Sequence, residues 1–257
     1  MDHLLVDISP DEWRGLLSRE KKRRGVPDNK LVFISASNLA RIAWCPMQAV
    51  RRSRLDELSV FQTYVEERLG YCLAVSRIST IPFDRDRWLD LAAADPPLAK
   101  VEELLLPYQW QRFRYVGGYY ETYEGDRSWA EPDMPSMEWQ FSIAGYVIAA
   151  APDGLTRSEV VEAKSARNSY LAGYQRPVGE LQADIYGVLF ERETKVLCIT
   201  VGNGDFVWDR SPVRHAAFAD CLRMFSRIAS GWTPPAPKEA WKCRNCEVNQ
   251  GCPIRRT

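Results

Sequence analysis

Apolar residues recur with a helical period in some stretches of this chain and gather in short β-type runs in others. The stretches with a period near 3.6 residues predict helices. They cover residues 8–25, 56–75, 178–192 and 212–229. Ser37 has the side chain of a helix N-cap, so a further helix is expected to begin there and lead toward Cys45.

Strands are predicted where apolar or β-branched runs end at turn residues. These runs cover residues 141–150, 159–164, 196–201 and 206–208. Between the first two, the triplet Pro152-Asp153-Gly154 has the composition of a turn. The order strand, strand, helix, strand, helix predicts an α/β core with a central mixed sheet flanked by helices.

No Gly/Ser-rich linker divides the chain, so we expect a single domain over residues 1–257. Its parts are an N-terminal helical part, an insertion, the α/β core and a cysteine-bearing C-terminal segment. They cover residues 1–75, 76–137, 138–230 and 231–257. Within the insertion we expect a helix near 98–106 and a strand near 108–116.

Charge changes this picture little, because 34 basic and 34 acidic residues cancel. Any basic surface must therefore be local, as in the cluster of Arg51, Arg52 and Arg54. No apolar stretch approaches the roughly 20 residues of a membrane helix, and the first residues lack the pattern of a secretory signal. We expect a cytoplasmic protein without a membrane partner, in which clustered cysteines more often bind metal than form disulfides.

Four of the seven cysteines lie in two groups at opposite ends of the chain, while Cys72, Cys198 and Cys221 stand singly in apolar surroundings that predict core residues. Cys243, Cys246 and Cys252 stand close together, whereas Cys45 lies far upstream, and Cys45 and Cys252 are each followed by proline. Thiolates select zinc, copper(I) or iron–sulfur clusters. Structural zinc sites usually have two Cys-x-x-Cys pairs, while Cys-Pro recurs at iron–sulfur ligands. The spacing therefore favours a [4Fe–4S] cluster over zinc, with a third reading in which Cys45 is merely buried.

Glu162 and Lys164 stand two apart in a predicted strand, so their side chains share a face. A carboxylate beside a lysine can hold a divalent ion, Mg²⁺ or Mn²⁺, while the ammonium positions or activates water. Such an ion usually needs a second carboxylate. Gln182 and Tyr186 share a helix face and are candidates to contact a phosphate or to orient Lys164.

Together these motifs resemble the PD-(D/E)XK nuclease superfamily. The resemblance is closer to the RecB-like iron–sulfur exonucleases, which include the fourth CRISPR-associated (Cas) protein family. The resemblance spans roughly residues 35–253. It implies a restriction-endonuclease-like core and a small helical iron–sulfur region formed by both ends of the chain. It also implies metal-dependent cleavage of single-stranded DNA ends or overhangs, in CRISPR spacer acquisition or DNA repair, with an integrase or a helicase as a protein partner.

Two features depart from that family. Its metal-binding histidine normally follows the first cysteine, but this chain has only His3 and His215, and Glu66 or Glu67 stands in the corresponding region. The place of the family's metal-binding aspartate falls on Ile148.

Asp153 is the nearest aspartate, and the register of one hairpin decides its role. If Asp153-Gly154 forms the turn, Asp153 lies about 26 Å along the strand from the residue opposite Glu162. If the turn centres on 156–157, that separation falls to roughly 7 Å, within reach of a shared ion. Asp-Gly is the stronger turn signal, so the first register is favoured and predicts a weak or inactive site.

Two hypotheses follow. In the first, the protein is a metal-dependent DNA exonuclease. Asp153 and Glu162 hold the metal, Lys164 activates water, and Gln182 and Tyr186 guide the strand. In the second, the fold is a degenerate scaffold that binds DNA or a protein. The residues that would contact a nucleic acid are then Arg51, Arg52, Arg54 and Arg167, with Tyr170 and Tyr174.

Overall fold

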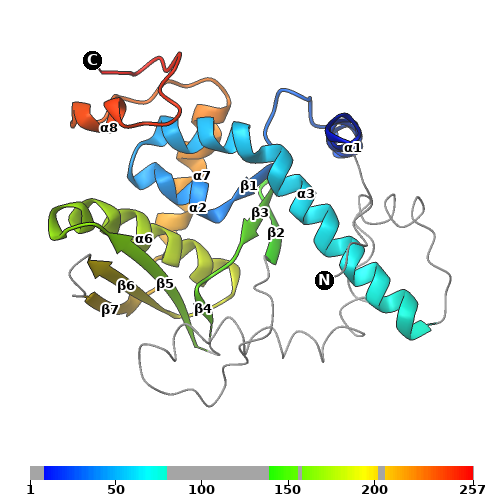
Figure 1. The fold of residues 1–257 in the computed structure, drawn as a ribbon, viewed down its shortest axis with the longest axis horizontal. Helices are drawn as coiled ribbons and strands as arrows, with labels where there is room; N and C mark the ends of the chain where they lie inside the picture. The colour runs from blue at the N-terminus through cyan, green and yellow to red at the C-terminus, as the bar shows by residue number, and fades with distance from the viewer. Residues whose placement is uncertain (1–8, 80–138, 156–157, 202–205, 257) are drawn as a thin grey trace.

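A computed structural model describes residues 9–79, 139–155, 158–201 and 206–256; for residues 66–79, 139, 155 and 206–208 this description covers the backbone alone. Helices and strands are both present, arranged as two small sheets with helices packed against them (Figure 1). The mixed α/β class is therefore as predicted. The insertion expected over 76–137 lies almost entirely outside the described residues.

The N-terminal part is helical apart from one short strand. Its elements are α1 (Pro10–Arg23), β1 (Phe33–Ser35), α2 (Ala36–Ala40), a 3₁₀ turn (Arg41–Ala43) and α3 (Pro46–Ser79). The N-cap of α2 is Ser35, whose hydroxyl accepts the amide of Asn38, so the prediction of Ser37 as the cap is wrong by two residues. The helix predicted over 56–75 is also longer, because α3 begins directly after Cys45.

A tight turn divides the apolar run predicted as one strand over 141–150. It forms β2 (Trp139–Ile143) and β3 (Tyr146–Ala150), joined through Ala144 and Gly145. Both turn residues have positive φ, 51° and 84°, as a two-residue hairpin requires. Alanine at the first of these positions gave no turn signal, which is why the sequence pattern appeared continuous.

The two sheets replace the single central sheet that was expected. In the first, β3 lies between β1 and β2, parallel to β1 and antiparallel to β2. The second has the order β4-β5-β6-β7, with β5 and β6 parallel. Its strands are β4 (Gly154–Leu155), β5 (Glu159–Ala166), β6 (Thr194–Val201) and β7 (Phe206–Pro212).

Helix α6 (Ser169–Leu189) links β5 to β6 and packs on both strands, as the crossover between parallel strands must. It begins earlier than the predicted start at 178, because Asn168 caps it by accepting the amide of Leu171. Glycines permit its close approach to the sheet. A Cβ on Gly179 would lie 2.6 Å from a methyl of Leu197 and 3.2 Å from Cγ of Lys164. The main chain of α6 is thereby held next to the strand that carries Glu162.

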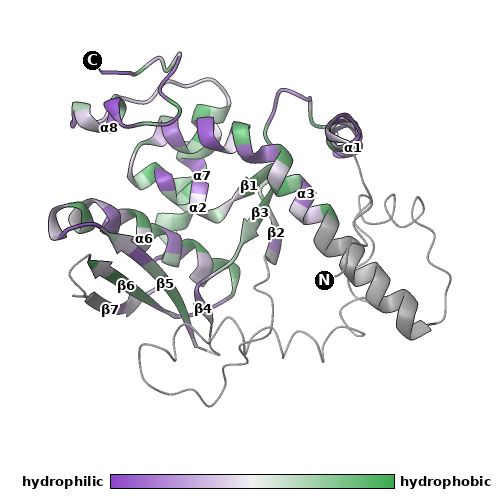
Figure 2. Ribbon diagram, in the orientation of Figure 1, coloured by the Kyte–Doolittle hydropathy of each residue, from purple (hydrophilic) through white to green (hydrophobic). Residues whose placement is uncertain are grey.

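Apolar side chains from both ends of the chain share one core. Those of α2 and the start of α3 pack with β3, α6 and α7 (His215–Ala229), and β6, which also faces α6, is largely apolar (Figure 2). Cys198 and Cys221 are buried, and burial raises the pKa of Cys221 to about 12. Both therefore behave as the core residues that their apolar surroundings predicted. In the described part of the chain, no helix has the length and apolarity to cross a bilayer.

Candidate active site

The pairing of β4 with β5 settles the position of Asp153. Gly154 pairs with Val161 and the next residue with Val160. Continuing this register by one residue places Asp153 opposite Glu162. Neither predicted register is correct: the favoured turn at Asp153-Gly154 is wrong, because Gly154 lies inside a strand. In the alternative register Asp153 would lie two residues from the residue opposite Glu162. The observed pairing closes that gap and brings the two carboxylates closer together.

Asp153, Glu162 and Lys164 come together at this point of the sheet. One carboxylate oxygen of Asp153 accepts the amide N–H of Ala163 at 2.7 Å. Glu162 forms an ion pair through Oε1 with the ammonium of Lys164. Its other oxygen, Oε2, is buried and accepts no hydrogen bond from the described residues. A buried carboxylate oxygen without a donor is costly, and it is the kind of atom that a cation would satisfy.

Lys164 is held from its other side by α6. Its ammonium donates to Oε1 of Gln182 at 2.8 Å, and Nε2 of Gln182 donates to the hydroxyl of Tyr186 at 2.8 Å. That hydroxyl in turn donates to the carbonyl of Ala151 at 3.1 Å. The chain of bonds connects the strand, the helix and the segment before β4. Gln182 and Tyr186 therefore lie where the helix-face prediction placed them, orienting Lys164.

Burial dominates the electrostatics of the two carboxyl groups. Loss of solvent raises the pKa of Glu162 to about 8, with the nearby Asp153 adding to the rise and Lys164 opposing it. Burial also raises the pKa of Asp153, against the Ala163 amide and Lys164. Two neighbouring carboxyl groups with raised pKa values favour a divalent cation, because it would compensate both negative charges.

Ile148, the residue at the expected aspartate position, is fully buried in the core on β3. It therefore has no place in a polar site. Across the described residues, no three histidine, cysteine, aspartate or glutamate side chains are grouped as ligands of one metal ion. The side chains of Glu66 and Glu67, the candidate replacements for the histidine, lie outside the description.

A groove opens beside Lys164 and Gln182. Its other walls come from the α2–α3 region and from the C-terminal segment that contains α8 (Ala240–Arg244). Polar side chains dominate these walls: Ser37, Arg41, Gln48, Gln175, Lys242, Asn245 and Glu247. Sequence reasoning missed this set, since its members come from distant segments and share no motif.

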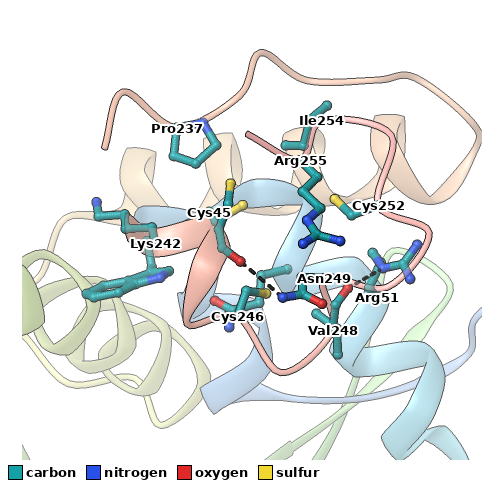
Figure 3. Close-up of a pocket in the computed structure, with 13 residues that line it drawn as sticks. Cys45, Arg51, Pro237, Lys242, Cys246, Val248, Asn249, Cys252, Ile254 and Arg255 are labelled. Carbon is teal, nitrogen blue, oxygen red and sulfur yellow. Dashed lines mark hydrogen bonds between the residues drawn. The ribbon is translucent and has the colours of Figure 1, made fainter. Parts of the chain in front are cut away.

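The four cysteines expected to bind a cluster line one small pocket (Figure 3). Cys45 comes from the turn before α3, whereas Cys243, Cys246 and Cys252 come from the C-terminal segment. Burial raises the pKa of the Cys45 thiol, and the nearness of Cys246 and Cys252 adds to the rise. The structure thus brings both ends of the chain to one pocket. Among the described residues the thiols are not grouped as ligands of one metal ion, so the metal site that the spacing predicted stays a prediction.

Arg51 ties these two ends together. Its guanidinium donates to the carbonyls of Val248, at 2.9 Å, Gly251, at 3.2 Å, and Gln250 (Figure 3). The basic cluster is therefore engaged within the protein rather than free for phosphate. Arg52 pairs with Asp56 and Glu247, and Arg54 donates to the carbonyl of Ala229. Three of the five N–H donors of Arg51 are used within the protein, and its predicted contact with nucleic acid stays a prediction.

No protein-family model matches the chain, and no curated protein matches it in sequence. Solved structures that resemble it include the protein SSO0001, at 18% identity and a TM-score of 0.47, covering 95% of this chain and 96% of that one. An alkaline exonuclease from Laribacter hongkongensis has 14% identity and a TM-score of 0.32, over 78% and 88% of the two chains. A candidate exonuclease from Eubacterium rectale has 10% identity and a TM-score of 0.36, over 98% and 96%.

Proposed function

We propose that this protein is a metal-dependent nuclease that hydrolyses phosphodiester bonds at DNA ends. The observation that carries the proposal is the register of β4 against β5, which sets Asp153 opposite Glu162 and next to Lys164. It removes one of the two reasons for expecting a degenerate site, the large separation of the two carboxylates; the other is the absence of the family's histidine. The nuclease hypothesis is therefore preferred over the scaffold.

Asp153 and Glu162 would hold the ion, Mg²⁺ or Mn²⁺. A bound ion supplies charge stabilisation for the phosphate and lowers the pKa of water. The free Oε2 of Glu162 fits this role, because it is buried without a donor among the described residues. Further oxygen ligands would be water and substrate, since such ions take about six oxygens.

Lys164 is positioned to direct the attacking water. Its ammonium is fixed by Glu162 and Gln182, and its side chain is 22% exposed, so it reaches the groove. Gln182 and Tyr186 hold that orientation through the carbonyl of Ala151. A fixed cation next to the scissile phosphate stabilises the charge that develops in the transition state without reorganising.

The cysteine pocket would hold a [4Fe–4S] cluster, with zinc as the alternative. Its four thiols are soft donors from both ends of the chain, gathered around one cavity. The group would bind the C-terminal segment to the start of α3, and the hydrogen bonds of Arg51 hold the same two regions together. A place in CRISPR spacer acquisition or DNA repair, beside an integrase or helicase, agrees with an enzyme that trims single-stranded ends.

The experiment is degradation of end-labelled single-stranded DNA with Mn²⁺ by the wild type and by Glu162→Gln. We expect the variant to lose about 100-fold or more of the rate, as for a residue that holds a catalytic metal. Glu159→Gln is the matched control, a carboxyl group on the same strand that pairs with Arg210. Equal rates for wild type and Glu162→Gln would refute the assignment of the site.

The cluster is tested separately by anaerobic purification followed by iron, sulfide and zinc analysis. A brown protein with iron and sulfide in equal amounts, lost in Cys246→Ser and kept in Cys198→Ser, is the expected result. A colourless protein with one zinc ion would establish the alternative.

A further inference from the structure

Four aromatic rings form a cluster beside the groove, at the N-terminal end of α6. This aromatic cluster consists of Trp44, Tyr170, Tyr174 and Trp241. The ring centroids lie 5.5 Å apart for Trp44 and Trp241, and 5.2 Å apart for Tyr174 and Trp241. Tyr170 and Tyr174 are also 5.2 Å apart, in an edge-to-face arrangement. The cluster joins α6 to the residues just before Cys45 and just before Cys243.

Lys242 fixes the inner part of the aromatic cluster. Its ammonium lies 4.8 Å from the ring centroid of Trp44 and 4.9 Å from that of Tyr174, and its side chain is only 11% exposed. The ammonium of Lys242 thus occupies the space between those two rings, which leaves no room there for a base. Tyr170 is different: it is 63% exposed, although its hydroxyl lies 3.3 Å from that of Tyr174. Tyr170 therefore exposes its ring to solvent while its contact with Tyr174 fixes its position.

The aromatic cluster continues the wall of the groove that holds Lys164. Trp44 and Lys242 line this groove together with Lys164 and Gln182. Tyr170 and Gln182 both lie on α6, and at 1.5 Å per residue they are about 18 Å apart along its axis. A strand with one phosphate next to Lys164 would reach Tyr170 within a few nucleotides.

We propose that Tyr170 stacks on an unpaired base of a single-stranded polynucleotide lying in the groove. The inference rests on the proposed function, because it takes the groove to hold a nucleic acid. An unpaired base offers its face to an aromatic ring, whereas the bases of a duplex cover one another. Arg41, which also lines the groove and has a side chain that is 39% exposed, supplies a cation for the phosphates. Tyr170 thus favours single strands over duplexes.

The test is the binding of a fluorescent single-stranded DNA oligonucleotide in EDTA, which prevents cleavage. Tyr170→Ala should weaken binding by about five-fold to a hundred-fold, the range measured for one stacked base. Tyr170→Phe keeps the ring and should bind as the wild type does. Leu55→Ala removes another apolar side chain, 69% exposed on α3, and should leave the affinity unchanged.

A second oligonucleotide with the same phosphates but abasic sugars separates stacking from charge. Tyr170→Ala should bind it as well as the wild type does. Equal losses on both oligonucleotides would mean that the ring only supports the fold, and no loss on either would overturn the stacking. If Tyr170→Ala loses more affinity for a single-stranded RNA oligonucleotide than for the DNA one, the site is assigned to RNA. Failure of the wild type to bind any strand would reject the proposed function as well, whereas binding that ignores Tyr170 rejects this inference alone.

Discussion

At the candidate active site every side chain stands on a strand, a helix or the residue next to one, whereas at the cysteine pocket two of the four thiols, those of Cys246 and Cys252, come from irregular chain. Asp153, Glu162 and Lys164 are fixed by the pairing of β4 with β5, and Gln182 is fixed by α6 packed on that sheet. The cysteines are instead gathered by α8, the loop after it and the hydrogen bonds of Arg51. Strands and a helix position the residues of the candidate active site, whereas a few polar contacts position those of the cysteine pocket.

This difference predicts different consequences of damage. A change at the active site should remove chemistry and leave the fold, because the sheet persists without any one polar side chain. A change at the pocket should loosen the C-terminal segment, because little regular structure holds it. The predictions that follow test this contrast, beginning with the largest effect.

Asp153→Asn should abolish metal-dependent cleavage, lowering the rate by about 100-fold or more, while the thermal midpoint of unfolding stays near that of the wild type. The reason is that the amide retains the hydrogen bond to Ala163 but not the negative charge. Cleavage assays and circular dichroism measure the two quantities. Asp209→Asn, which changes an exposed carboxylate paired with Arg176, is the control. Full activity of Asp153→Asn would contradict the metal role.

Arg51→Ala should destabilise the C-terminal segment by about 2–4 kcal/mol, since three carbonyls lose a charged donor. Limited proteolysis should then cut first after residue 231, before the core unfolds. Arg54→Ala, which removes one bond to the Ala229 carbonyl, should have a much smaller effect. Cleavage that begins inside the core in Arg51→Ala would show that the two regions unfold together.

Gly179→Ala should destabilise the protein by about 1–3 kcal/mol, because the added Cβ would press on Leu197 and on the stem of Lys164. Cleavage should fall in parallel as the lysine shifts. Gly173→Ala lies on the same helix with nothing within 4 Å of the new Cβ, so it should stabilise by up to about 1 kcal/mol. Chemical denaturation measures both. If Gly179→Ala has the same free energy of unfolding as the wild type, α6 can move away from β5 without loss of stability.

Without metal, the two regions should lose stability in different pH ranges. The folded protein raises the pKa of Glu162 from 4.5 to about 8, so it holds a proton that the unfolded chain releases. Its contribution is complete below pH 4.5 and falls as the pH rises to about 8. The pKa values of Cys45 and Cys246 are raised above 9.0 mainly by burial, so their contribution falls only above pH 9.

Thermal unfolding of the metal-free protein in chelator, followed between pH 4 and pH 10, measures both ranges. Glu162→Gln should flatten the curve below pH 8 and leave the part above pH 9 unchanged. If the curve for Glu162→Gln matches that of the wild type at every pH, another group causes the pH dependence.

The sequence predicted the components of both sites better than their arrangement. Glu162 and Lys164 were assigned to one face of a strand by their spacing, and Gln182 and Tyr186 to one face of a helix. These are properties of local periodicity, which a linear pattern contains. The lining of one pocket by Cys45 and the C-terminal cysteines agrees with the prediction that these soft donors share a site, while the metal itself stays a prediction.

Registers and turns were predicted poorly. Ala144 and Gly145 form a hairpin turn where no strong turn signal stands, and Asp153-Gly154 does not form one where the signal is strong. A turn dipeptide contributes little free energy compared with the burial of a whole strand. The apolar residues of β5, Val160 and Val161, are fully buried, and this burial outweighs the local preference for a turn.

The sequence alone determined which chemistry is present: two carboxylates with a lysine, four thiols with paired spacing, and an overall alternation of strands and helices. Only the tertiary structure decided that Asp153 lies opposite Glu162, that Arg51 donates to three carbonyls, and that Trp44 and Lys242 line one groove with Lys164. The physical reason is that residue type and period are local, whereas register and neighbourhood depend on which distant surfaces bury each other. One step of strand register reverses every side chain, and no single residue in the sequence specifies that step.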